Sequence, residues 1–195
     1  MFKEVKDVGP RLICFLALSG VSVVDSPRDC LDQPGLMGGY ITGTNLIELC
    51  HSNVHRADQD LERVLRHEMV HAIQENCDLR ESLIPEPLLT WLVRWTMDDR
   101  EVMTVLLYDE HETDQEFEAR LLANLPNWVV GSLLWISEHR HSAVHAGLQL
   151  PQPWEVIPVE AILWRDSVRP GPSLSRRGKV DSSRQSPCDG VVLLD

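Results

Sequence analysis

The order of hydrophobic and polar residues along the chain predicts short β-strands set among helices. Residues 8–18 have a helical pattern that ends before Gly20. The β-branched run 21–24 predicts a short strand, and residues 40–49 predict a strand or hairpin. Gly43 interrupts the second of these segments, where it would form a turn or a bulge.

A longer helical pattern follows the hairpin. Asp58 is a favourable N-cap residue, and acidic side chains occupy the turn after it, so we expect the helix to begin there. Apolar residues then recur at helical spacing, which predicts one buried face made of Leu61, Val64, Leu65, Met69, Ala72 and Ile73.

Three further helices are predicted: after Pro87, over residues 113–125, and from Pro126 onward. The expected fold is therefore α+β, mostly helical, with a small β-sheet or hairpin before the helix from Asp58. We expect one domain over residues 1–165. Residues 166–195 are rich in Ser, Arg, Pro and Gly, a composition that predicts a disordered C-terminal tail.

The amino-acid composition argues against nucleic acid and membranes as partners. The chain has 195 residues, 43% of them hydrophobic, and a net charge of −12, which argues against nucleic acid as a partner. The longest apolar run, 12–24, is shorter than the roughly 20 residues that span a bilayer. Basic residues precede it as in a signal peptide, but Glu4 and Asp7 dilute them and no cleavage site follows. We therefore expect a cytoplasmic protein with no membrane partner.

The number and spacing of the cysteines also favour a cytoplasmic location. There are five, an odd number without CxxC spacing, so neither a disulfide framework nor a four-cysteine zinc site is indicated. Free, mostly buried thiols are expected at Cys14, Cys30, Cys50, Cys77 and Cys188.

The helix from Asp58 carries the sequence His67-Glu68-Met69-Val70-His71. Residues four apart lie on the same helical face, so both imidazoles can bind one zinc ion. Glu68 can reach a water molecule on that metal and act as a general base. The motif thus provides two metal ligands and one catalytic carboxylate.

Two other histidine pairs in the chain have the same spacing. They are His51 with His55 and His141 with His145, and in neither is the first histidine followed by glutamate. We interpret both pairs as solvated side chains rather than metal ligands.

A catalytic zinc ion normally has three protein ligands, so a third ligand is expected downstream. Glu118 lies beside the apolar stripe of the 113–125 helix, whereas Glu116 is about 200° away around the helix. A buried carboxylate needs a partner, which favours Glu118 as the third ligand. Glu112 and His111 remain alternatives.

A strand, an HExxH helix and a second helix with Glu-Ala together resemble the zincin metallopeptidases, in the gluzincin branch. The chain is similar to the minimal gluzincins of bacteria and phages, the immunity-repressor-cleaving kind. The matching segments are residues 39–49, 66–71 and 118–126. The resemblance implies zinc on His67, His71 and Glu118, with Glu68 as the base.

The resemblance also implies that residues 40–49 form an edge strand along which a peptide substrate extends. Gluzincins usually have a Tyr or His that stabilises the oxyanion, and the candidates here are Tyr108, His111 and His139. None of them matches a motif.

The leading functional hypothesis is a zinc-dependent peptidase that hydrolyses peptide bonds in a peptide or protein substrate. The alternative is a catalytically inactive, zinc-stabilised binding or regulatory module. A third interpretation, a helical protein without metal, would make the histidine pair a coincidence. The sequence does not predict substrate, cleavage preference or oligomeric state.

Overall fold

The computed structural model describes residues 8–25, 27–77, 83–145 and 157. The predicted disordered tail at 166–195 and the domain end at 165 lie outside these residues. Within them, no helix is both long enough and apolar enough to cross a membrane.

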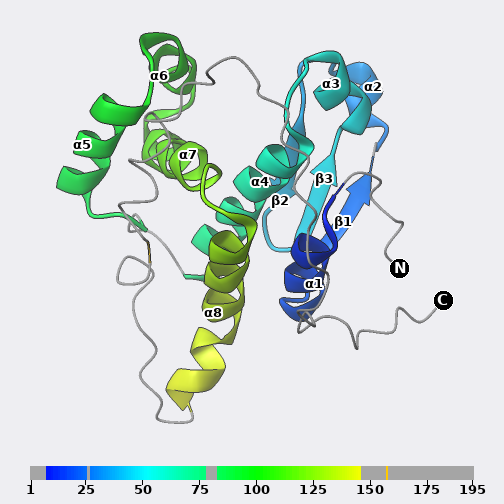
Figure 1. Ribbon diagram of the computed structural model, residues 1–195, viewed down its shortest axis with the longest axis vertical. Coiled ribbons are helices and arrows are strands. Elements are labelled where there is room, and N and C mark those ends of the chain that lie inside the picture. The colour runs from blue at the N-terminus through cyan, green and yellow to red at the C-terminus, as the bar shows by residue number, and fades with distance from the viewer. Residues whose placement is uncertain (1–7, 26, 78–82, 146–156, 158–195) are drawn as a thin grey trace, which may run out of the picture.

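The fold is α+β and mostly helical, with a small sheet, as predicted. The N-terminal part alternates helices and strands, and the regular elements described after residue 50 are all helices (Figure 1). The elements are α1 (Pro10–Leu18), β1 (Ser22–Asp25), α2 (Asp29–Asp32), β2 (Gly38–Ile41), β3 (Leu46–Leu49), α3 (His51–Arg56), α4 (Leu61–Asn76), α5 (Glu86–Thr96), α6 (Asp99–Val105), α7 (Glu110–Leu122) and α8 (Asn127–His145).

The three strands of the described residues form one sheet with the order β1-β3-β2. β1 pairs with β3 in parallel, and β2 pairs with β3 antiparallel, so the predicted hairpin is confirmed. Its turn contains Gly43 and Asn45 at φ values of 77° and 51°, in the left-handed region that glycine and asparagine tolerate best. β2 is therefore an edge strand of this sheet.

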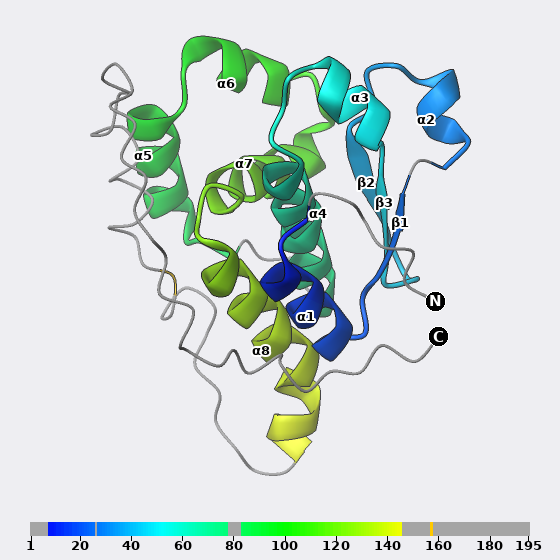
Figure 2. The ribbon, with the colours of Figure 1, turned by 45° about the vertical axis from the view of Figure 1, so that its right-hand side comes forward.

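α4 is the central element of the molecule. It packs against β2 and β3 on one side and against α7 and α8 on the other (Figures 1 and 2). Its N-cap is Asp60, whose side chain accepts a hydrogen bond from the backbone N–H of Glu62 at 3.0 Å. The helix thus begins slightly later than predicted, because Asp58 has a positive φ of 53° and lies outside it.

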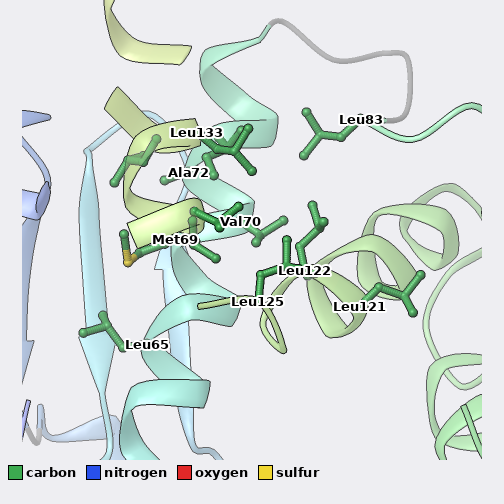
Figure 3. Close-up of a cluster of buried hydrophobic side chains, with 14 of the residues drawn as sticks. Leu65, Met69, Val70, Ala72, Leu83, Leu121, Leu122, Leu125 and Leu133 are labelled. Carbon is green, nitrogen blue, oxygen red and sulfur yellow. The ribbon is translucent and has the colours of Figure 1, made fainter. Parts of the chain in front are cut away.

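The buried face of α4 forms the middle of the hydrophobic core. Figure 3 shows Leu65, Met69 and Val70 of α4 in one cluster with leucines of α7 and α8. Burial of such side chains contributes about 1.5–3 kcal/mol each. The packing fixes the rotation of α4 about its axis, and with it the direction in which the polar face of α4 points.

The expectation of free thiols is wrong for three cysteines. Cys30 and Cys50 form a disulfide bond, and Cys14 is disulfide-bonded as well. Cys77 is free. The prediction relied on the odd number of cysteines and on the absence of CxxC spacing. Neither feature shows which cysteines meet in the folded chain, where two that are 20 residues apart come together. Disulfides persist under oxidising conditions, so the cytoplasmic location loses the support that free thiols would have lent it.

Candidate metal centre

The two histidines of the HExxH motif converge from one face of α4. The Nε2 atoms of His67 and His71 are 3.2 Å apart, and the rings meet edge to face with centroids 4.8 Å apart. Both side chains are partly buried. The i,i+4 spacing therefore brings the two nitrogens within reach of one common ligand.

Glu116 of α7 completes this group. Its Oε2 lies 3.4 Å from His67 Nε2 and 3.6 Å from His71 Nε2. The three donor atoms all lie within 4.8 Å of one another, so His67, His71 and Glu116 could hold a metal ion. Two neutral nitrogens and one carboxylate oxygen are a typical donor set for a divalent transition metal.

The sequence favours Glu118 as the third ligand, whereas the group of described residues that could hold a metal contains Glu116 instead. Glu118 is fully buried at 0% exposure, and it is not part of the group that His67, His71 and Glu116 form. Its Oε1 accepts a hydrogen bond from the backbone N–H of Ile84 at 2.6 Å, and its Oε2 accepts one from Gln74 Nε2 at 3.0 Å. Protein groups thus satisfy this carboxylate without a metal.

Sequence reasoning favoured Glu118 over Glu116 because it treated α7 as a helix with a single buried stripe. Residues 116–119 are all buried, although they cover a full helical turn. α7 packs against α4 on one side and against α5 and α6 elsewhere, so helical phase does not separate Glu116 from Glu118. Phase could have excluded a solvated residue but could not choose between two buried ones.

Electrostatic contacts keep Glu116 ionised. Burial by itself would raise its pKa, but hydrogen bonds with His67 and His71 and one from Arg120 hold that pKa below the usual range. Arg120 Nε donates to Glu116 Oε1 at 2.9 Å, which leaves Oε2 directed at the histidines. For His71, burial opposes the charged form, yet Glu116 and Glu68 raise its pKa.

Glu68, the predicted base, lies next to this group and is 6% exposed. Burial raises its pKa above the ordinary carboxyl value, while the charges of His67 and His71 and a hydrogen bond from the backbone N–H of Tyr40 act in the opposite direction. A carboxylate with a raised pKa holds a proton more readily, as an acid–base group must.

The group opens onto a cavity of about 620 Å³. One wall is α4, a second is α7, and the third is the edge strand β2 with Gly38, Gly39 and Tyr40. Tyr108 and Glu112 also line the cavity, whereas His139 stacks on Trp135 and donates from Nδ1 to the carbonyl oxygen of Trp135 at 2.9 Å. The side chain of His111 lies outside the described residues.

Sequence reasoning missed two further residues of the site. Gly38 is so close to Glu68 that an added Cβ would lie 3.3 Å from Glu68 Cγ. Gln74 contacts His71 Nδ1 with its Oε1 at 2.8 Å. Gln74 occupies the position three after His71, so its place on the same helical face was available as a signal.

Comparison of this chain with protein-family models, with curated proteins and with solved structures finds no match. The site must therefore be interpreted from its own geometry and chemistry.

Proposed function

We propose that this protein is a zinc-dependent peptidase. The observation that carries the proposal is the convergence of His67, His71 and Glu116 beside Glu68 in a cavity bordered by an edge strand. The zincin-like resemblance of the HExxH segment points to the same reaction, with Glu116 in place of Glu118 as third ligand.

The spacing of the three donor atoms fits a tetrahedral ion. Ligands about 2.0–2.1 Å from tetrahedral zinc lie roughly 3.3 Å from each other by simple geometry. The measured separations are 3.2, 3.4 and 3.6 Å. Three protein ligands leave a fourth position open, which is the arrangement of catalytic rather than structural zinc.

The zinc ion would supply Lewis acidity, polarising a peptide carbonyl and making water more acidic. Glu68 then takes a proton from the attacking water as the new carbon–oxygen bond forms. It passes that proton to the nitrogen of the leaving amine as the carbon–nitrogen bond breaks. Its burial and raised pKa suit a group that must hold a proton between these two steps.

Two neighbours of Glu68 fit a peptide substrate. Among the described residues, the outer edge of β2 pairs with no other strand, and β2 borders the cavity. An extended peptide can add to such an edge by backbone hydrogen bonds. Tyr108 lines the cavity, and burial raises its pKa, which keeps its hydroxyl able to donate. We assign Tyr108 as the hydrogen-bond donor to the developing oxyanion.

The charge of the other residues that line the cavity decides which peptides should be tested first. Glu75 and Glu112 add carboxylates to the wall, and none of the described lining residues is Lys or Arg. Acidic peptides should therefore bind poorly, and a substrate search should begin with neutral and basic sequences.

The test is digestion of a neutral and basic peptide library by zinc-loaded protein, with products identified by mass spectrometry. Wild type should cleave, and Glu68→Gln should keep its zinc but lose roughly 10²–10⁴-fold in turnover. Glu86→Gln, at the exposed start of α5, is the matched control and should behave as wild type.

Two outcomes would overturn the proposal. A wild-type protein that binds no added zinc would remove the peptidase mechanism altogether. Zinc binding with no cleavage of any library member, by wild type or Glu86→Gln, would instead support the zinc-stabilised binding module.

A further inference from the structure

We infer that Gln74 is a positioning residue that fixes the tautomer and the ring orientation of His71 for metal binding. The inference rests on the proposed metal site but not on peptidase activity. It concerns a hydrogen-bonded chain, the Gln74 relay, made of His71, Gln74, Glu118 and the backbone carbonyl of Gln115.

The first step is the orientation of the Gln74 amide. Its Nε2 lies 3.0 Å from the carbonyl oxygen of Gln115 and 3.0 Å from Glu118 Oε2. A backbone carbonyl can only accept a hydrogen bond, so the nitrogen end of the amide must face it. The reversed orientation would bring two oxygens together. Gln74 is 4% exposed, so solvent cannot relieve such a clash.

The second step is the tautomer of His71. With the amide fixed, Gln74 Oε1 faces His71 Nδ1 at 2.8 Å, and an amide oxygen can only accept. Nδ1 must therefore carry the proton and donate it. In neutral imidazole the other nitrogen then has the free lone pair. That nitrogen, Nε2, is the one that lies 3.6 Å from Glu116 and 3.2 Å from His67 Nε2.

The third step is the support behind Gln74. Glu118 is fully buried on α7, and its second oxygen accepts the N–H of Ile84, the last residue but one before α5. The relay therefore links α4 to α7 and to the segment that enters α5. This gives Glu118 a role close to the metal site without making it a ligand. Such outer partners of metal-binding histidines typically contribute 10–100-fold to metal affinity.

The relay can be tested with two substitutions of similar size. Gln74→Met removes both the acceptor and the donor, and it should weaken zinc binding about 10–100-fold in a chelator competition. In Gln74→Glu the new carboxyl group lies between the Gln115 carbonyl and the Glu118 carboxylate, which favour its protonated form. The protonated acid keeps an oxygen that accepts from His71 Nδ1 and a hydroxyl that donates to one of these two groups, so this variant should retain zinc affinity close to that of wild type. Asn76→Leu is the control on the same helix, because Asn76 donates to Glu138 of α8 and takes no part in the relay.

Nitrogen NMR of metal-free protein gives a readout that needs neither zinc nor substrate. Neutral His71 should carry its proton on Nδ1 in wild type, Gln74→Glu and Asn76→Leu. In Gln74→Met the proton should move to Nε2 in a large fraction of molecules. Thermal unfolding of each variant shows whether it is folded.

Zinc affinity of Gln74→Met within twofold of wild type would overturn the inference, as would an Nε2 proton on wild-type His71. If Gln74→Met fails to fold, the wild-type tautomer and the affinity of Gln74→Glu still decide the question. A protein without zinc affinity would contradict both the proposed function and this inference. A protein that binds zinc and has the Nδ1 tautomer but cleaves no peptide would contradict the proposed function and leave the inference intact.

Discussion

α3 and α4 follow one another along the chain, and each carries two histidines at i,i+4 spacing. On α4, His67 and His71 meet a buried glutamate from α7. On α3, His55 is exposed, and within the described residues neither His51 nor His55 belongs to a metal-binding group. The spacing of two histidines thus does not make a site. A facing element that brings a third donor does.

The two helices are also held in different ways. The start of α3 is fixed covalently, because Cys50 precedes it and is bonded to Cys30 of α2. Asn53 of α3 then donates to the carbonyl oxygens of Cys30 and Leu36 at 3.0 and 2.8 Å. α4 is held by packing on both sides, together with Arg66, which donates from Nε to the carbonyl of Ala123 at 2.7 Å. Packing against α7 and α8 thus holds α4, whereas the disulfide bond and Asn53 hold α3.

The largest expected effect separates the two histidine pairs. His71→Ala removes one of the three donor atoms of the candidate metal centre. It should lower zinc affinity by more than about 100-fold, which is more than the loss expected when a residue that only hydrogen-bonds to a ligand is replaced. His55→Ala, the matched change on α3, should leave zinc content near one ion per chain. Elemental analysis after dialysis measures both. Equal zinc loss in the two variants would mean that the α3 pair takes part in binding.

The next prediction compares three of the four glutamates of α7. Glu116→Gln exchanges the anionic donor for a neutral amide and should also lower zinc affinity more than about 100-fold. Glu112→Gln, one turn earlier on the cavity wall, should change it little. Glu118→Gln should cost less than Glu116→Gln, because the carbonyl of Gln115 still holds Gln74. If Glu118→Gln caused the largest loss, Glu118 would be the ligand after all.

Local pattern was sufficient for much of the fold. Helical periodicity predicted α4 and its buried face, and the β-branched and glycine positions predicted the hairpin, because these features depend on neighbours within a few residues. The two motif histidines followed from the same local rule. Each of these features has its cause close by in the chain.

The third donor of the metal centre, the disulfide bond and the contact of Gly38 with Glu68 depend on contacts between segments that are distant in the sequence. Glu116 and Glu118 are two residues apart on a helix that is buried all around at that turn. Glu116 faces His67 and His71 of α4, whereas Glu118 accepts hydrogen bonds from Gln74 and from the backbone N–H of Ile84. The Cys30–Cys50 bond depends on how the loop before β2 folds back. Gly38 has no side chain, so no pattern of polarity could mark its contact with Glu68.

Removal of the disulfide bond before α3 should change stability rather than zinc affinity, and by less than the ligand substitutions change zinc affinity. Replacing both Cys30 and Cys50 with serine should lower the free energy of unfolding by about 2–4 kcal/mol, because the unfolded chain gains freedom. Zinc affinity should stay within a few-fold, since no metal-binding residue lies on the loop that the bond closes. Chemical denaturation and zinc competition measure the two quantities. A zinc loss as large as in His71→Ala would show that the α3 region supports the site.

The smallest expected effect concerns two adjacent glycines of β2. An added Cβ at Gly38 would lie 3.0 Å from the carbonyl oxygen of Glu48 and 3.2 Å from a methyl group of Val64, whereas one at Gly39 would meet nothing within 4 Å. Gly38→Ala should therefore cost about 1 kcal/mol of stability by overpacking. It should also displace Glu68, so that peptide turnover falls while zinc stays bound. Gly39→Ala is the matched control on the same strand. Unchanged turnover in Gly38→Ala would mean that β2 yields to the added methyl group and does not fix the position of Glu68.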